Sequence, residues 1–354
     1  MKTSHLFRIL MIVISGFLFI QCTSEYELVQ GPPGVDGIDG VDGADGVDGT
    51  ASCVSCHSNA FREPIRVAYA ASKHGSGDTW ASRGTSAVCS RCHSNEGFID
   101  VISVNFIDST GLVIPNPDGY AIGNPINCSG CHDSHRSFDF ENDGNDKAVR
   151  SLAAVDLFLD PTVQIDIRNS SDELGLSNLC VNCHQPRNSY AIPAGTEDYE
   201  ITSSRFGPHH GPQSTVLEGI MGANIAGAVG YPGVGAAGHR SGSSCIACHM
   251  GPTTDGTDGG HTWQPTVNAC VACHASGPPS EVTDFTTDMA TLKALLIAEG
   301  SLLDNDRTVP GVYSAAVAKA TWNYRTLLED QSMGVHNPNY AKALLKNSIE
   351  ALQN

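Results

Sequence analysis

One short motif recurs through this sequence: two cysteines separated by two residues and followed directly by a histidine. Twelve of the 13 cysteines fall into six copies of it. Two thiols at this spacing can reach both vinyl groups of one porphyrin, and the adjacent histidine then lies under the iron as its proximal ligand. Each copy predicts one covalently attached c-type haem, six in all. In chain order, motifs one to six are Cys53, Cys56 and His57; Cys89, Cys92 and His93; Cys128, Cys131 and His132; Cys180, Cys183 and His184; Cys245, Cys248 and His249; and Cys270, Cys273 and His274.

Paired cysteines also occur in disulfide frameworks and in zinc sites. Neither alternative explains why a histidine follows every pair. Zinc sites built from four thiolates would also compete with oxidation outside the cytoplasm. Haem attachment is therefore the interpretation that the motif favours.

The second axial ligand decides whether a haem only carries electrons or also binds substrate, because an iron held by two histidines has no open position. Outside the motifs and the N-terminal segment there are seven histidines, close to one for each iron. They are the candidate distal ligands His74, His135, His209, His210, His239, His261 and His336. One of them is spare, and we expect it in the adjacent pair His209 and His210. Met250 and Met333 remain alternative ligands. His135 follows His132 too closely to serve the same haem, so we expect it to cap a neighbouring one.

The amino-acid composition limits how the interior can be filled and which partners the protein can bind. Aromatic residues make up 6% of the chain, and it contains 37 glycines and 18 prolines. An ordinary apolar core would be thin, and haem groups would have to fill part of the interior. The formal net charge of −18 argues against nucleic acid or an anionic lipid surface as the partner. Cations, metal oxides and basic redox proteins fit this charge better.

The N-terminus has the pattern of an export signal over residues 1–21, with basic residues before an apolar run. The run is too short for a permanent membrane helix. Cys22 lies outside the six motifs and at the position of a lipidated cysteine, which predicts an outer-membrane lipoprotein displayed at the cell surface; a periplasmic or secreted protein is the alternative. Residues 22–51 carry glycine at every third position from Gly31 to Gly49, which predicts an extended collagen-like spacer. Trimerisation through this spacer is the other interpretation.

The remaining chain divides into a hexahaem region over 52–282 and a C-terminal helical segment over 283–354 that packs on it. The first is rich in glycine, serine and proline, and predicts loops and short helices. The second shows apolar residues at helical spacing and predicts helices over Asp284–Leu303, Val312–Leu328 and Asn337–Leu352. The fold class expected is mainly α with much irregular loop, wrapped around a haem chain.

Two phrases resemble segments of bacterial multihaem cytochromes, a group that includes relatives of the pentahaem nitrite reductase. They run from Phe206 to Gln213 and from Asp330 to Leu345. The resemblance implies that His209 or His210, and His336, are distal ligands. Nitrite reductases of that group bind the catalytic haem through Cys-x-x-Cys-Lys, which does not occur here. The sequence therefore argues against nitrite reduction.

These features predict an exported electron-transfer protein with six bis-histidine haems, working as a respiratory conduit at the cell surface. No catalytic residue is expected. Two alternatives stay open. One is a reductase of a nitrogen or sulfur oxyanion at one open haem, and the other is self-association as the subunit of a cytochrome filament. Other redox proteins or external electron acceptors are the expected partners.

Overall fold

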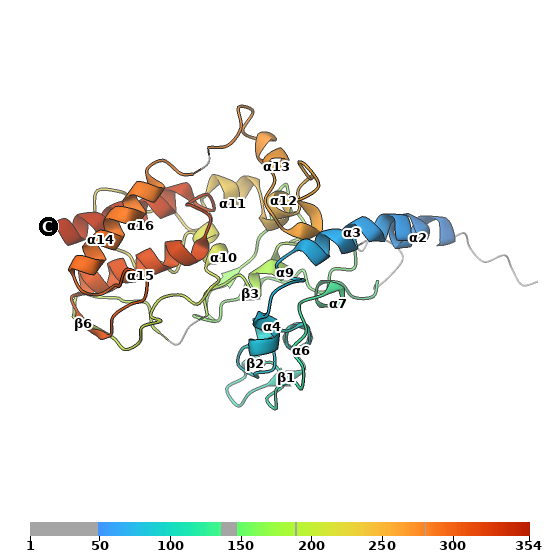
Figure 1. Cartoon of the computed structure of the whole chain (residues 1–354), viewed down its shortest axis with the longest axis horizontal. Coiled ribbons are helices and arrows are strands. Elements are labelled where there is room, and N and C mark those ends of the chain that lie inside the picture. The colour runs from blue at the N-terminus through green and yellow to red at the C-terminus, as the bar shows by residue number, and fades with distance from the viewer. Residues whose placement is uncertain (1–48, 136–146, 188–189, 280) are drawn as a thin grey trace, which may run out of the picture. The chain divides into compact units, whose positions relative to one another are not determined.

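The computed structural model describes residues 49–135, 147–187, 190–279 and 281–354 (Figure 1). The chain divides into two units, Met1–Val54 and Ser55–Asn354. The predictions for the export signal, for Cys22 and for most of the spacer lie outside the described residues. Helix α2 spans Gly49–His57, so it begins within the last residues of the predicted spacer and ends on the histidine of motif one.

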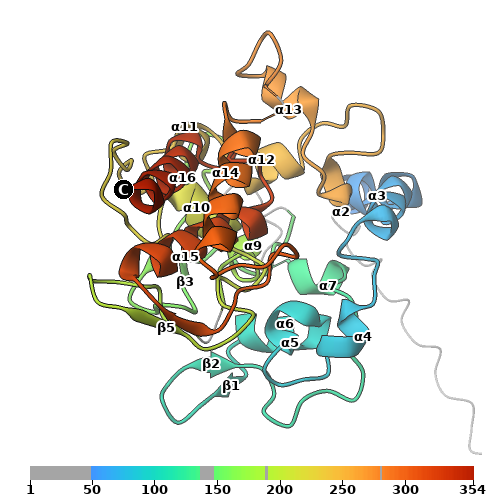
Figure 2. The same cartoon turned by 60° about the vertical axis from the view of Figure 1, so that its left-hand side comes forward.

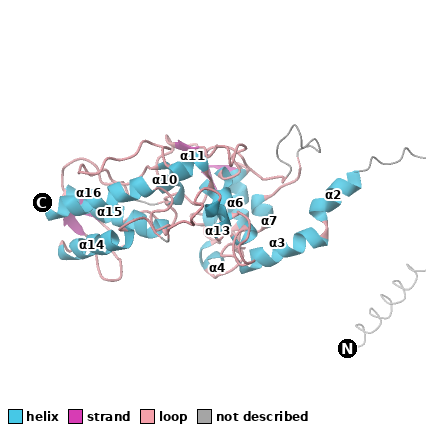
Figure 3. Ribbon diagram, turned by 90° about the horizontal axis from the view of Figure 1, so that it is seen from above, coloured by secondary structure: helices cyan, strands magenta, loops and turns pink. Residues whose placement is uncertain are grey.

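Short helices and long connections dominate the chain from α2 to α13 (Figure 3). After α2 come α3 (Asn59–Ala71), α4 (Thr79–Arg83), α5 (Ser90–His93), α6 (Asn95–Ile102), α7 (Cys128–Cys131), α9 (Asn178–Val181), α10 (Gln213–Glu218), α11 (Gly238–Gly242), α12 (Cys245–His249), the 3-10 helix η1 (Gly260–Thr262) and α13 (Val267–Val271).

Within the described residues, the strands are short and form two-stranded antiparallel sheets. The pairs are β1 (Phe106–Ile107) with β2 (Val113–Ile114), β3 (Val155–Asp156) with β4 (Gln164–Ile165), and β5 (Tyr199–Ile201) with β6 (Gly311–Tyr313). The prediction of a mainly helical fold with much irregular loop is confirmed.

Three of the motif helices begin at a capping side chain. Asn127 accepts a hydrogen bond from Ser129 N at 2.9 Å, and Ser244 accepts one from Ala247 N at 3.3 Å. Thr266 does the same for Ala269 N at 2.9 Å. Such caps satisfy amides that the first helical turn leaves unpaired. One turn brings residues three apart to the same face, so the two cysteines of a motif can meet one porphyrin edge.

The C-terminal segment forms three packed helices, α14 (Phe285–Ala298), α15 (Ala315–Asp330) and α16 (Pro338–Gln353). All three predicted helices are present, and α14 ends earlier than predicted because the chain turns at Gly300, where φ is +75°. The side chain of Asn337 caps α16 by accepting from Tyr340 N at 3.1 Å.

Buried amides attach these helices to the segment before motif five. Asn323 of α15 accepts a hydrogen bond from Ala223 N at 2.7 Å. Asn347 of α16 donates to Val229 O at 2.8 Å. The largest apolar cluster joins Leu292 and Leu296 of α14 to residues of α15 and α16. The C-terminal helices therefore hold the loop that precedes motif five.

The motif region has smaller apolar clusters, as the composition predicted. One contains Phe98, Ile126 and Leu179, with Cys131 and Cys183 packed against it. The thiols of two motifs thus lie beside one small core. Within the described ranges, no helix is long and apolar enough to cross a membrane.

Candidate haem sites

The structure pairs the histidines of the sequence in a regular way. Six contacts each join one motif histidine to one histidine outside the motifs, and no ring is used twice. The centroid separations are 6.1 Å for His57 and His135, 6.2 Å for His184 and His74, 6.5 Å for His93 and His209, 6.3 Å for His132 and His261, 6.3 Å for His249 and His336, and 6.0 Å for His274 and His239.

These separations can be compared with those that an iron would impose. A metal–nitrogen bond of about 2.0 Å on each side, with each nitrogen about 1.2 Å from its ring centroid, places two coordinated imidazoles about 6.4 Å apart. The observed centroid separations, from 6.0 to 6.5 Å, include that value. The residues present therefore fit a haem iron held between each pair.

Many of these rings are oriented through Nδ1, which frees Nε2 to point at a metal. His132 Nδ1 lies 2.7 Å from Lys147 O, and His249 Nδ1 lies 2.9 Å from Trp263 O. A carbonyl only accepts, so Nδ1 must carry the proton there. A second hydrogen bond of this kind fixes the tautomer and orientation of a metal-binding imidazole.

Three further rings have oxygen atoms at Nδ1. His239 contacts Val335 O at 2.5 Å, His336 contacts Asp330 Oδ1 at 2.7 Å, and His184 contacts Gln213 Oε1 at 3.3 Å. The exception is His57, whose Nδ1 contacts the guanidinium of Arg62. Since a guanidinium only donates, His57 has the other tautomer in this arrangement.

Burial keeps several of these imidazoles neutral. It lowers the pKa of His74 to about 4, and the nearby His184 adds to the effect. It also lowers the pKa of His209 to about 4, together with His210 and Arg187. Neutral imidazole is the form that binds a metal, so these rings need not lose a proton to ligate.

His336 shows the opposite direction. Burial on its own lowers the pKa of this ring, but the Asp330 carboxylate at Nδ1 outweighs it and the pKa is raised. Asp330 is itself 2% exposed. A buried carboxylate bound to a ligating imidazole makes that imidazole a stronger donor to a metal.

His210 is the histidine left over. Its ring lies 4.7 Å from that of His209, and its Nδ1 lies 2.6 Å from Glu329 Oε2. The hydrogen bond to Glu329 raises the pKa of His210. Glu329 is fixed in turn by Arg325 at 2.6 Å. His210 is thus engaged with a carboxylate, while His209 faces His93.

None of the twelve motif cysteines forms a disulfide with another. The residues of motif four lie close to two other motifs. Cys183 Sγ lies 3.8 Å from Arg91 O of motif two, and Cys245 of motif five packs on the apolar cluster that contains Val181. Within the described ranges, no group of three or more His, Cys, Asp or Glu side chains is arranged to hold a metal ion by itself.

Four of the motif thiols are exposed in the structure, those of Cys53, Cys56, Cys128 and Cys273. The Cys56 Sγ lies 3.7 Å from the Ser55 hydroxyl. The helix that follows motif one, α3, buries no residue and so provides no apolar core around these two thiols. Haem attachment at all twelve thiols stays a prediction.

Sequence reasoning missed two residues that lie among these sites. Arg91, inside motif two, is 9% exposed, and its guanidinium lies 4.6 Å from the centre of the Phe158 ring. Trp263 has its ring 4.5 Å from His74 and 5.4 Å from His261. The signal for Arg91 was its place between two haem-binding cysteines; nothing local marked Trp263 beyond its closeness to His261.

Comparison with known proteins identifies the class. No family model matches the chain. It is 25% identical to the C-type polyheme cytochrome OmcC of Geobacter sulfurreducens over 363 aligned positions, covering 78% of this chain and 44% of that protein. It is 24% identical to OmcB of the same organism, covering 76% of this chain and 44% of that protein. The chain thus spans less than half the length of these relatives. The crystal structure of the outer cell wall cytochrome OcwA aligns with a TM-score of 0.49 and 19% identity, over 82% of this chain and 50% of that one.

The motifs and the sequence relationship together define a multihaem cytochrome that carries haem c. The chain is distantly homologous to the Geobacter polyhaem cytochromes OmcC and OmcB.

Proposed function

We propose that this protein transfers electrons through six covalently bound haems, each held between two histidines. The observation that carries the proposal is the set of six ring pairs, since each motif histidine has its own second ring at the spacing that a coordinated iron requires. Distal ligands would be His135 for motif one, His209 for two, His261 for three, His74 for four, His336 for five and His239 for six.

The protein's own residues would hold and orient the group. The cysteines of each motif would attach the haem covalently, and the two histidines of each pair would ligate its iron. Hydrogen bonds such as that from His249 Nδ1 to Trp263 O keep the ring in place. When bound, haem c supplies an iron that accepts and releases one electron, and two histidine ligands give a low potential.

The ring pairs favour electron transfer over the reductase hypothesis. A reductase needs at least one iron with an open face. In the described residues every motif histidine has a partner, and the spare His210 is bonded to Glu329. We therefore assign no substrate-binding haem.

We place the protein outside the cytoplasm, as a lipoprotein anchored at Cys22. This placement rests on the N-terminal sequence alone. The net charge of −18 suits a basic redox partner or a positively charged mineral surface. Substituting Cys22→Ala and comparing membrane association and surface proteolysis with the parent chain tests the anchor.

The primary experiment uses the purified, oxidised, haem-loaded protein. Intact mass and pyridine haemochrome absorbance should report six haems. Electron paramagnetic resonance (EPR) and near-infrared magnetic circular dichroism should report only low-spin bis-histidine iron. Addition of carbon monoxide, nitrite or hydroxylamine should change neither spectrum. A high-spin iron that binds one of these ligands would replace this proposal with the reductase.

A further inference from the structure

Motif four, which begins on helix α9, lies against residues of two other motifs. Cys183 Sγ lies 3.8 Å from Arg91 O, inside motif two. Cys245 of motif five packs on the apolar cluster that contains Val181, the residue that follows Cys180. Each of these sulfurs is an attachment point on a porphyrin edge. The edge attached through motif four is therefore next to two other edges.

Motif three is the third neighbour of motif four, and it lies on the side of the distal ligand His74. His74, the ring paired with His184, lies 4.5 Å from the Trp263 ring. The same Trp263 ring lies 5.4 Å from the ring of His261, which is paired with His132 of motif three. One indole thus separates the distal ligands of motifs three and four. Cys131 and Cys183 also pack on the same apolar cluster.

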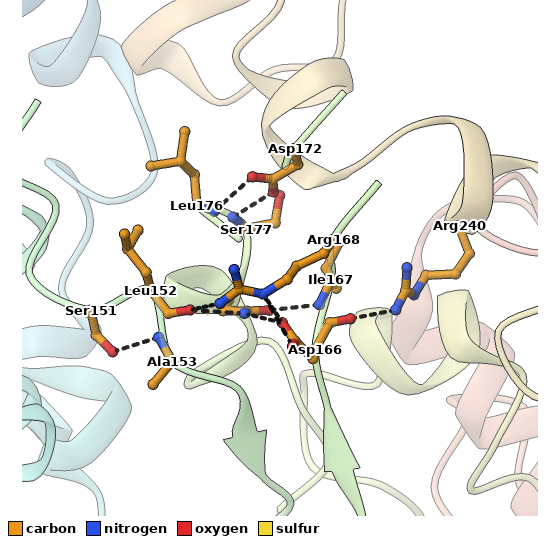
Figure 4. A network of polar contacts seen from close by, with 11 residues as sticks. Ser151, Leu152, Ala153, Asp166, Ile167, Arg168, Asp172, Leu176, Ser177 and Arg240 are labelled. Carbon is orange, nitrogen blue, oxygen red and sulfur yellow. Dashed lines mark hydrogen bonds and ion pairs between the residues drawn. The ribbon is translucent and has the colours of Figure 1, made fainter. Parts of the chain in front are cut away.

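A polar network fixes α9 in place. Asp172 accepts hydrogen bonds from Leu176 N at 2.7 Å and Ser177 N at 2.8 Å, where the helix begins (Figure 4). Asn178 donates to Asp166 Oδ1 at 2.7 Å, and Arg240 donates to Asp166 O at 2.6 Å. Arg240 follows His239, so the network joins motif four to the segment that carries a distal ligand.

Helix α9 lies among α7, α10 and α12 in both views of the fold (Figures 1 and 2). Ile246 N of α12 donates to Ser177 Oγ at 3.2 Å, which joins motif five directly to the start of α9. Asn178, Leu179 and Val181 of this helix are buried. Cys180 and Cys183 are partly buried, while both thiols of motif one, Cys128 of motif three and Cys273 of motif six are exposed.

The outer motifs each connect inward through their distal ligands. His135, paired with motif one, is three residues from His132 of motif three. His239, paired with motif six, contacts Val335 O beside His336, which is paired with motif five. Motif one therefore adjoins motif three, and motif six adjoins motif five.

We propose that the haem of motif four is the junction of a branched set, directly adjacent to the haems of motifs two, three and five. The haems of motifs one, two and six are then three separate ends. This inference rests on the proposed six-haem function and adds its connectivity. A branched set can accept electrons at one end and divide them between two others, which a single row cannot do.

The test counts neighbours in the haem-loaded full chain. Methionine in place of a distal histidine raises the potential of that haem. In His74→Met, the haem of motif four would therefore be reduced before the others. Its low-spin ferrous iron is diamagnetic, so its magnetic coupling to neighbouring ferric irons would disappear. We expect the EPR signals of three other haems to change at that step. The matched variant His135→Met changes an end haem, and one neighbouring signal should change.

Two or fewer changed signals in His74→Met, or equal numbers in the two variants, would overturn the branched arrangement. Haem content and the number of low-spin irons in the parent protein test the proposed function separately. If either variant fails to load six haems, iron positions from anomalous diffraction of the parent crystal decide the matter. The iron of motif four should have those of motifs two, three and five as its nearest neighbours; a single row of irons would refute the junction.

Discussion

Nδ1 of His336 donates a hydrogen bond at 2.7 Å to Oδ1 of Asp330, while the same ring lies 6.3 Å from that of His249. One imidazole is thus held between a buried carboxylate and the histidine of motif five. With a haem iron bound by His336 as proposed, this carboxylate would add negative charge to the ligand and stabilise the ferric over the ferrous state.

We therefore expect Asp330→Asn to raise the midpoint potential of one haem. Loss of such a partner typically costs about 10- to 100-fold in metal affinity. If that loss falls on the ferric state, the shift is about 60 to 120 mV, at about 59 mV for each factor of ten. Spectroelectrochemical titration measures it. Glu63→Gln, at a side chain that is 64% exposed, is the control and should leave all six transitions in place. An unchanged titration for Asp330→Asn would contradict the assignment of His336 as a ligand.

The adjacent histidines His209 and His210 provide a matched pair of variants. His209→Ala should open the iron of motif two, giving a high-spin signal and carbon monoxide binding at one haem in six. His210→Gln should keep six low-spin irons because His210 is engaged with Glu329. EPR spectra with and without carbon monoxide distinguish the two. The reverse pattern would make His210 the ligand.

The buried Arg91 should set the potential of the haems near it. Its guanidinium lies against Phe158 and close to Cys92 and Cys183. A unit charge about 10 Å from an iron, at an effective dielectric constant of about 20, contributes about 1.7 kcal/mol, which favours the less positive ferrous state. Arg91→Gln should lower one or two midpoint potentials by some tens of millivolts. Arg66→Gln, at a side chain that is 61% exposed, should have almost no effect. Equal shifts in the two variants would rule out a local role for Arg91.

Trp322 should be a large contributor to the stability of the C-terminal scaffold. It is fully buried, packs against Phe206 at 5.4 Å, and donates from Nε1 to Met221 O at 2.9 Å. Trp322→Ala should cost about 3–5 kcal/mol through lost burial and a cavity. Trp322→Phe keeps most of the ring and should cost about 1–3 kcal/mol, mainly from the unpaired carbonyl. Chemical denaturation followed by far-ultraviolet circular dichroism measures both losses of stability. Equal losses would show that filling the site with an aromatic ring does not contribute to stability.

Acid should weaken the contact between α14 and α15. Asp306 accepts hydrogen bonds from Tyr324 at 2.6 Å and from Lys293 at 2.8 Å. Burial opposes ionisation, but these donors outweigh it and lower the pKa of Asp306. A depressed carboxyl pKa stabilises the fold above the unfolded value of about 3.9, and this contribution is lost as the pH falls through the folded value.

Asp306→Asn should therefore destabilise the protein by about 1 kcal/mol at pH 7, after allowance for partial solvent screening. The difference from the parent should vanish once the pH has fallen below the lowered folded pKa of Asp306, where both side chains are neutral. Asparagine tolerates the φ of +63° at this position, so backbone strain does not confuse the comparison. Thermal unfolding at a series of pH values measures it. A difference that persists at low pH would assign the effect to shape instead of charge.

Much of the helical tail followed from local sequence. Asn337 with Pro338 predicted the start of α16, because a capping side chain and a fixed φ act within one turn. The end of α14 was missed, since the apolar spacing continues into Leu302 and Leu303 after the chain has already turned at Gly300. Leu302 is nevertheless buried, as a residue of the loop that follows the helix.

The sequence by itself determined where haem attachment is predicted, because two thiols and a histidine within five residues need no other part of the chain to meet one porphyrin. It also provided the number of candidate second ligands. Only the tertiary structure decided which histidine faces which: His74 meets His184, and His93 meets His209, across long stretches of loop whose path no local pattern encodes. It also decided that Cys56 is exposed while Cys183 lies against Arg91 of motif two. The physical reason is the distance along the chain over which each interaction acts. Attachment depends on one turn of backbone, whereas ligand pairing and the surroundings of each thiol depend on how buried helices and polar networks pack together.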